Sequence, residues 1–219
     1  MYLKWDETKI EDFSEKNISK LYNQGFVFTR IDHGILNQTR SLRIDLKNFE
    51  FTSENKRILR KTEKIKLENT SLPYSNYNWS IAKLAKDFYE KKFGKNIFSA
   101  NKIKEILTTN KNNFNQLLIY KENDENIGFA ICYENEEILH YSYPFYNLKN
   151  ENKNIGMGMM LKAIEYAKKN NKKYVYLGSA QRPSDVYKFQ FKNMEFFSGE
   201  NWSKNFDDLK EALKYGDNK

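Results

Sequence analysis

The residues of this sequence best suited to chemistry are two glycines that stand at the start of a predicted helix. The segment reads Lys153, Asn154, Ile155, Gly156, Met157 and Gly158, and it leads into a helical pattern over residues 156–170. Glycines at such a junction let the backbone approach a ligand, and the N–H groups of the first turn face an anion with the helix dipole behind them. The segment predicts a site for a negatively charged donor molecule. An ordinary tight turn is the alternative.

Side chains that could move protons follow in the last third of the chain. Tyr187 has a phenolic proton to give to a leaving group, with simple packing as its alternative. Asp185 and Glu195 are candidates for the base that receives a proton from an amine, and a carboxylate at either position could instead cap a helix. His140, in a predicted strand, fits a satisfied core or surface histidine better than a base.

The elements that must position these residues are predicted from hydrophobic periodicity and from turn residues. Helices are expected over residues 10–24, 80–92, 101–108, 156–170 and 184–193. Strands are expected over residues 25–29, 34–37, 41–51, 116–120, 128–133, 138–145, 173–178 and 194–202. Short strand spacings around residues 116–145 indicate an antiparallel sheet. We predict either an N-terminal layer over 1–72 with a second domain over 73–219, or one compact unit.

Two segments between these elements are polar. Residues 53–66 contain the cations Lys56, Arg57, Arg60 and Lys61, which suit RNA phosphates or a solvated helix face. Residues 68–77, with Pro73 and several Asn and Ser, are the best linker in the chain.

Composition narrows the class of protein. Hydrophobic residues make up 39% of the 219 residues and aromatic residues 16%, which argues against disorder. No run approaches the roughly 20 apolar residues that span a bilayer, and the charged first residues do not resemble a secretory signal, so a cytoplasmic protein without a membrane partner is expected. A single cysteine, Cys132, leaves no disulfide and no cysteine-built metal site. The net charge of +8 suits a polyanion such as RNA, or reflects an AT-rich genome.

The glycine segment resembles the acyl-CoA-binding loop of the GNAT superfamily, in which Gln or Arg is followed by two residues, Gly, one residue and Gly or Ala. Lys153 stands in the first position, and Gly156 and Gly158 match. This resemblance implies an α+β (α/β three-layer) GNAT acyltransferase fold, a mixed and mostly antiparallel sheet flanked by helices. Tyr187 is similar to the GNAT tyrosine that protonates a leaving thiolate.

Read together, the two halves of the chain resemble the arginyl-tRNA and leucyl-tRNA protein transferases. The similar blocks are residues 41–61, Tyr141 to Pro144 with Tyr143 among them, the glycine segment, 174–178, and Tyr187 with Lys188. The resemblance implies that Tyr143, Tyr187, Lys188 and the glycine segment hold the donor. It also implies that the basic segment binds tRNA. The cysteine cluster of that family, expected just before Arg43, is absent, so no metal is expected.

The resemblance implies an aminoacyltransferase that moves an amino acid from aminoacyl-tRNA to a protein N-terminal amine. No cofactor is expected to be permanently bound, and the partners are tRNA and a protein or peptide N-terminus. An acetyl-CoA-dependent N-acetyltransferase is the first alternative. A GNAT-like domain that binds RNA or protein without catalysis is the second.

Overall fold

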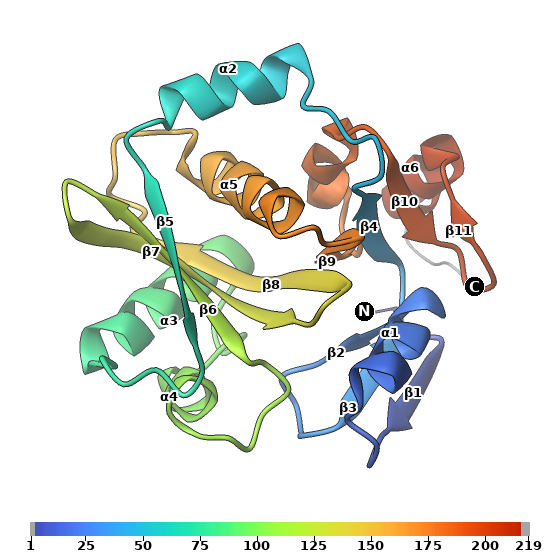
Figure 1. The fold of residues 1–219 in the computed structure, drawn as a ribbon, viewed down its shortest axis with the longest axis horizontal. Helices are drawn as coiled ribbons and strands as arrows, with labels where there is room; N and C mark the ends of the chain where they lie inside the picture. The colour runs from blue at the N-terminus through green and yellow to red at the C-terminus, as the bar shows by residue number, and fades with distance from the viewer. Residues whose placement is uncertain (1–2, 216–219) are drawn as a thin grey trace. The chain divides into compact units, whose positions relative to one another are not determined.

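The computed structural model describes residues 3–215 (Figure 1). The chain divides into two compact units, each assembled from separate segments. The first unit comprises Met1–Thr52, Asn135–His140 and Ala167–Lys219, and the second comprises Ser53–Glu134 and Tyr141–Tyr166. Strand β8 (Ile138–Tyr146) and helix α5 (Ile155–Lys169) contribute residues to both. The division at residue 72 stays a prediction about independently folding parts.

The second unit is built on a sheet with the strand order β8-β7-β6-β5. Strands β5 (Lys66–Ser71), β6 (Gln116–Glu122) and β7 (Glu125–Glu134) pair in antiparallel fashion. Residues 117–120 and 127–133 are buried without alternation, which requires cover on both faces of the sheet. Figure 1 shows this cover, with α5 on one face and α3 (Trp79–Phe93) and α4 (Ala100–Thr108) on the other.

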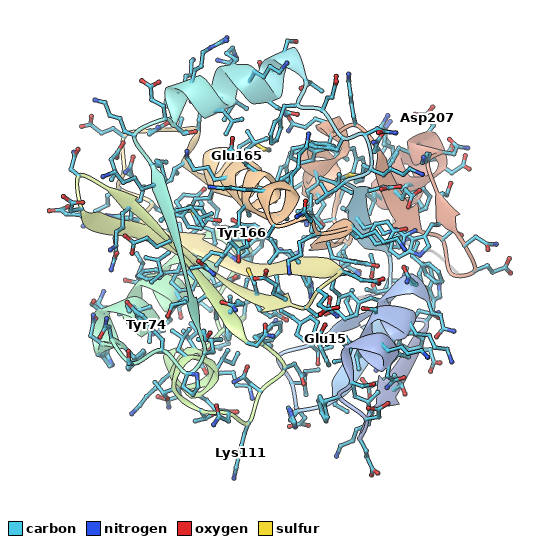
Figure 2. All side chains as sticks on the ribbon, in the orientation of Figure 1. Glu15, Tyr74, Lys111, Glu165, Tyr166 and Asp207 are labelled. Atoms are coloured by element: carbon cyan, nitrogen blue, oxygen red, sulfur yellow. The ribbon has the colours of Figure 1, made fainter. Side chains whose placement is uncertain are left out.

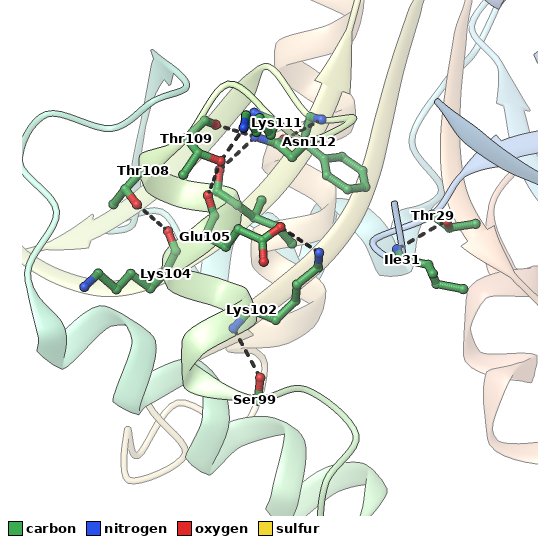
Figure 3. Close-up of polar contacts among 12 residues, drawn as sticks. Thr29, Ile31, Ser99, Lys102, Lys104, Glu105, Thr108, Thr109, Lys111 and Asn112 are labelled. Atoms are coloured by element: carbon green, nitrogen blue, oxygen red, sulfur yellow. Dashed lines mark hydrogen bonds and ion pairs between the residues drawn. The ribbon is translucent and has the colours of Figure 1, made fainter. Parts of the chain in front are cut away.

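Helix α4 shows why such short helices form here. Its N-cap residue Ser99 accepts a hydrogen bond from the Lys102 amide at 3.2 Å, and Lys102 pairs with Glu105 one turn along the helix at 2.8 Å (Figure 3). At the other end, Asn112 donates to the carbonyls of Ile106 and Thr109. Because both ends are satisfied, the apolar face with Ile103 and Ile106 is held in register with its neighbours.

The first unit contains a sheet with the order β11-β10-β4-β9-β8 and a small sheet with the order β1-β3-β2. The larger sheet uses β4 (Ser41–Asp45), β9 (Tyr174–Ser179), β10 (Met194–Phe197) and β11 (Trp202–Ser203). Its pairs are antiparallel except β8 with β9, which are parallel from Ile138↔Tyr174 to His140↔Tyr176. The small sheet uses β1 (Asp6–Lys9), β2 (Phe26–Phe28) and β3 (Ile35–Gln38). The helices are α1 (Glu15–Asn23), the 3₁₀ helix η1 (Pro183–Gln190) and α6 (Phe206–Tyr215).

The predicted fold class is confirmed, because the strands are mostly antiparallel and helices flank them. Several element bounds were wrong. The predicted linker over residues 68–77 contains most of β5, whose polar side chains hide a strand paired with β6. The predicted helix over 10–24 begins only at Glu15, after the Ser14 cap, and the strand over 41–51 ends at Asp45. Strand β1 and helix α6 were not predicted. Within residues 3–215, none of the helices combines the length and apolarity needed to cross a bilayer.

A buried arginine joins the strands of the first unit. The Arg43 side chain, in β4, is 8% exposed, and its Nε donates to Glu195 of β10 at 2.8 Å. Its Nη1 donates to Asn23 Oδ1 at 2.9 Å. The guanidinium carbon lies 4.1 Å from the centroid of the Tyr174 ring and 3.8 Å from that of Trp202. A planar cation suits this site because it can pair with a carboxylate and stack on aromatic faces simultaneously.

We expect Arg43→Met to lower the free energy of unfolding by about 3 to 5 kcal/mol, because the Glu195 carboxylate then stays in a buried position without its partner. Urea unfolding of the whole chain measures this. The double variant Arg43→Met, Glu195→Met should recover much of the loss. As a control, Arg57→Met removes an exposed ion pair with Glu54 and should leave the midpoint nearly unchanged. Equal midpoints for the Arg43 and Arg57 variants would contradict the proposed importance of the buried pair.

Candidate active site

The predicted donor segment forms the start of α5, and an asparagine organises it. The Asn154 amide donates to Asn152 Oδ1 at 3.0 Å, and the Ile155 amide donates to the Asn152 carbonyl at 3.1 Å. The Gly158 amide already donates to the Asn154 carbonyl at 2.7 Å. Among the amides of residues 154–156, only that of Gly156 has no acceptor in the part of the chain that the structure describes. The first turn therefore offers fewer amides to a ligand than the sequence suggested.

Both glycines are required for close packing. A Cβ at Gly156 would lie 2.9 Å from the Tyr146 hydroxyl, and a Cβ at Gly158 would lie 2.5 Å from Thr62 Cγ2. Thr62 directly follows α2 (Ser53–Lys61), so the second glycine lets α5 approach that helix end. Tyr146 also packs on Phe88, with ring centroids 4.8 Å apart. Whether the segment also holds a donor stays a prediction, with Lys153 exposed beside it.

The predicted RNA-binding residues lie on α2, also in the second unit. Lys56, Arg60 and Lys61 are exposed, whereas Arg57 forms a bidentate pair with Glu54. The Lys61 carbonyl accepts a hydrogen bond from Asn152 Nδ2 at 3.1 Å. The end of the basic helix is therefore tied to the loop before α5, and both belong to the same unit.

Tyr143, predicted to hold the donor, lies on β8 in the second unit. Its ring packs edge-on against Phe98 and Phe114, with centroids 5.3 Å away in each case. These contacts give the ring a packing role. Its predicted part in donor binding stays a prediction.

Tyr187, Lys188 and Asp185 all lie on η1 in the first unit. Asp185 accepts hydrogen bonds from the Gln181 and Arg182 amides at 2.8 and 3.0 Å, so it caps η1. Lys188 has a side chain only 12% exposed, and its ammonium donates to the Ser179 carbonyl at 3.3 Å. Burial lowers the pKa of Lys188, and the Asp185 carboxylate 4.0 Å away opposes that shift. Tyr187 is 48% exposed, which leaves its phenol accessible.

Glu195 is engaged in the ion pair with Arg43, and Lys204 lies 3.7 Å from its other oxygen. Its structural role is clear from these contacts, as is the capping role of Asp185. The predicted assignment of either carboxylate as a base stays a prediction.

His140 is a satisfied core histidine. It is 1% exposed, and its Nδ1 lies 2.9 Å from the Tyr22 hydroxyl. The Phe28 amide donates to that same hydroxyl at 3.2 Å, so the Tyr22 proton is directed to His140 Nδ1. Burial, with a smaller contribution from the charge on Lys188, lowers the pKa of His140 to about 3. The ring is therefore neutral throughout the physiological range and unsuited to act as a base.

No group of three or more His, Cys, Asp or Glu side chains in residues 3–215 is arranged to hold a metal ion. Cys132 is fully buried in β7, and burial raises the pKa of its thiol.

The family described as "Arginine-tRNA-protein transferase, C terminus" matches residues 59–198, more than half of the chain. The chain belongs to this transferase family. The matched region contains the start of α5, all of η1 and Glu195, whereas Arg43, Lys56 and Arg57 precede it. A search of curated protein sequences gives no match to this chain.

Solved structures similar to this member of the transferase family include three acyltransferase-like proteins. L-PGS from Bacillus licheniformis is 13% identical with a TM-score of 0.49, over 76% of this chain and 52% of that structure. FemX is 9% identical with a TM-score of 0.48, over 79% and 61%. A GCN5-related glucosamine N-acetyltransferase region of a fungal multi-domain β-N-acetylglucosaminidase is 12% identical with a TM-score of 0.47, over 86% and 22%. The chain spans about half the length of the L-PGS structure.

Sequence reasoning missed the residues that hold the predicted ones in place. Asn152, Thr62 and Tyr146 shape the start of α5, and Gln181 fixes the turn before η1. Asn152 gave a partial signal, because asparagines recur before the helix as they do in side-chain-capped turns. Gln181 gave none, since its partners are distant in the sequence.

The buried His140 predicts a specific dependence of stability on pH. Its pKa is lower in the folded protein than the ordinary value of 6.5, so its contribution is complete above pH 6.5 and is lost as the pH falls toward 3. Between pH 7 and pH 5 the loss should be about 2 kcal/mol. His140→Asn keeps an acceptor near Nδ1 and cannot titrate. Urea unfolding should show the stability advantage of the wild type over this variant shrinking by that amount, and a constant difference would contradict a buried neutral ring.

Proposed function

We propose that this protein is an aminoacyltransferase that moves an amino acid from aminoacyl-tRNA to the α-amine of a protein or peptide. The observation that carries the proposal is the match of the arginine-tRNA-protein transferase family to residues 59–198. That region includes the glycine segment and the Tyr187-Lys188 pair, the two places where sequence and structure put groups suited to an activated ester.

The reaction asks little of the protein beyond positioning. An amine attacks the ester carbonyl that links the amino acid to the tRNA, a tetrahedral intermediate forms, and the ribose oxygen leaves with a proton. In this proposal the Gly156 amide and the exposed Lys153 ammonium bind oxygen atoms of the donor. The accessible Tyr187 phenol is the proton donor to the leaving oxygen. Asp185 and Glu195 would act as bases only by exchanging the partners that they hold.

The exposed cations of α2 support a nucleic acid donor over a small thioester. Lys56, Arg60 and Lys61 are exposed, and the Asn152 bond connects their helix to the loop that leads to Lys153. Cations in such an arrangement follow a phosphate backbone without reading its sequence. We propose that tRNA phosphates bind here, and Arg57 contributes less because Glu54 neutralises it.

Transfer itself is tested with three labelled donors: arginyl-tRNA, leucyl-tRNA and acetyl-CoA, each with a mixture of peptides. We expect an amino acid to appear on peptide α-amines. Lys153→Glu should reduce this transfer about tenfold or more, because it places a negative charge where a donor oxygen binds. Lys149→Glu changes an exposed cation of the same loop and should retain activity. Label transferred only from acetyl-CoA would overturn the proposal, as would no transfer from any donor.

Binding of tRNA tests α2 separately. The double variant Lys56→Glu, Arg60→Glu should weaken binding of uncharged tRNA about tenfold or more at low salt, and should reduce the slope of log affinity against log salt by about 2. The matched control is Lys104→Glu, Lys111→Glu. Both residues are exposed in the same unit, and Lys111 points into solvent (Figure 2). Equal losses in the two variants would show that only overall charge matters.

A further inference from the structure

The side chain of Gln181 grips one peptide group of the chain's own N-terminal segment. Its Oε1 accepts a hydrogen bond from the Leu3 amide at 2.8 Å, and its Nε2 donates to the Leu3 carbonyl at 3.2 Å. Thr39, fully buried between β3 and β4, donates its hydroxyl proton to the same carbonyl at 2.7 Å. The N–H and C=O of one residue are therefore both bound by side chains that lie far along the sequence.

Such a contact recognises main chain rather than side chains. A primary amide has a donor and an acceptor side by side, so it can complete a ring of two hydrogen bonds with any residue that has a free N–H and C=O. The segment then continues as an added strand, since the Trp5 amide donates to the Gln38 carbonyl at 3.0 Å and β1 pairs with β3. This is the pattern by which sheets take up peptides of varied sequence.

The gripping side chain is held ready for this task. The Gln181 amide donates to Asp185 Oδ2 at 2.8 Å, so the cap of η1 also fixes the residue that holds Leu3. Its Nε2 lies 2.7 Å from Thr39 Oγ1 and 3.2 Å from Ser179 Oγ. Each neighbour is itself anchored in the first unit, which limits the freedom that binding would have to remove.

The site lies next to residues with predicted roles in the reaction. Ser179 links them, because its hydroxyl receives Gln181 Nε2 and its carbonyl receives the Lys188 ammonium. The Leu3 peptide group is therefore two hydrogen-bonded residues away from Lys188, all within one unit. An acceptor peptide bound in the same way would have its main chain beside η1 and Tyr187.

We propose that Gln181 and Thr39 form a binding site for the main chain of the acceptor polypeptide, and that residues 3–5 of this chain occupy it as an internal competitor. The acceptor role rests on the proposed function, whereas the peptide-binding role does not. The ligand is a polypeptide with a free N–H and C=O at the gripped residue and with little restriction on its side chain.

Two substitutions should have opposite effects if the proposal is correct. Leu3→Pro removes the N–H that Gln181 Oε1 accepts, so it releases the internal segment and leaves the grip intact. Affinity for an added peptide should rise about fivefold, the factor that one such hydrogen bond is worth. Gln181→Ala removes the grip from the internal and the added peptide alike, and affinity should fall about fivefold or more below the wild type. Leu3→Ala keeps both main-chain groups and serves as the control.

The probe is a fluorescent peptide with the sequence of residues 2–7, and its binding is followed by anisotropy on the whole chain without tRNA. A purely structural tie predicts that Leu3→Pro and Gln181→Ala lower the unfolding midpoint alike and leave peptide affinity unchanged, and that result would overturn the proposal. If Leu3→Pro does not fold, a chain lacking residues 1–4 replaces it, with the same expected rise. The peptide rate of aminoacyl transfer is measured in parallel.

The two proposals fail in distinguishable ways. Wild-type transfer with no opposing change in peptide affinity rejects the Gln181 site and keeps the aminoacyltransferase. Opposing changes in affinity without transfer from any donor support the peptide site and reject the enzyme.

Discussion

The charge on Arg43 is the constraint around which the first unit is arranged. A guanidinium that is almost excluded from water must have a carboxylate, further acceptors and polarisable neighbours, or the fold loses several kcal/mol. Glu195 provides the carboxylate, Asn23 an acceptor, and Tyr174 and Trp202 the aromatic faces. These residues come from β10, the end of α1, β9 and β11. One side chain therefore sets the register in which four elements meet β4.

In the second unit, space takes the place of charge as the main constraint. The first turn of α5 fits beside Tyr146 and Thr62 only because residues 156 and 158 lack side chains. That close approach brings the end of α2 against α5, where Asn152 adds a hydrogen bond to the Lys61 carbonyl. The exposed cations of α2 are consequently presented on a helix whose opposite face, with Asn55 and Ile58, is buried. A surface for a polyanion and a segment for its reactive end are thus built by the same packing.

The sequence predicted elements with strong local periodicity and failed where partners are remote. Helices α3, α4 and α5 were placed within one or two residues, because apolar spacing and capping residues are local signals. Strand β5 was read as a linker, since its side chains are polar and only pairing with β6 makes it a strand. Asp185 and Glu195 were recognised as notable carboxylates, and a capping role was foreseen as an alternative. The pairing of Glu195 with Arg43, 152 positions away, has no local signature. Tyr166 is a similar case, since its hydroxyl donates to Glu134 across 32 positions (Figure 2).

The segmented make-up of the first unit has a consequence for the order of events during synthesis. Strand β4 emerges from the ribosome early, but β9, β10 and β11 follow more than a hundred residues later. Until they arrive, Arg43 stays hydrated and the flanking edges of β4 have no partners. Residues 53–134 form a nearly continuous stretch with mostly short-range pairings, so they can gather first. The first part of the chain to be made would then be among the last to become native, and a chaperone that shields a nascent strand would act on β4.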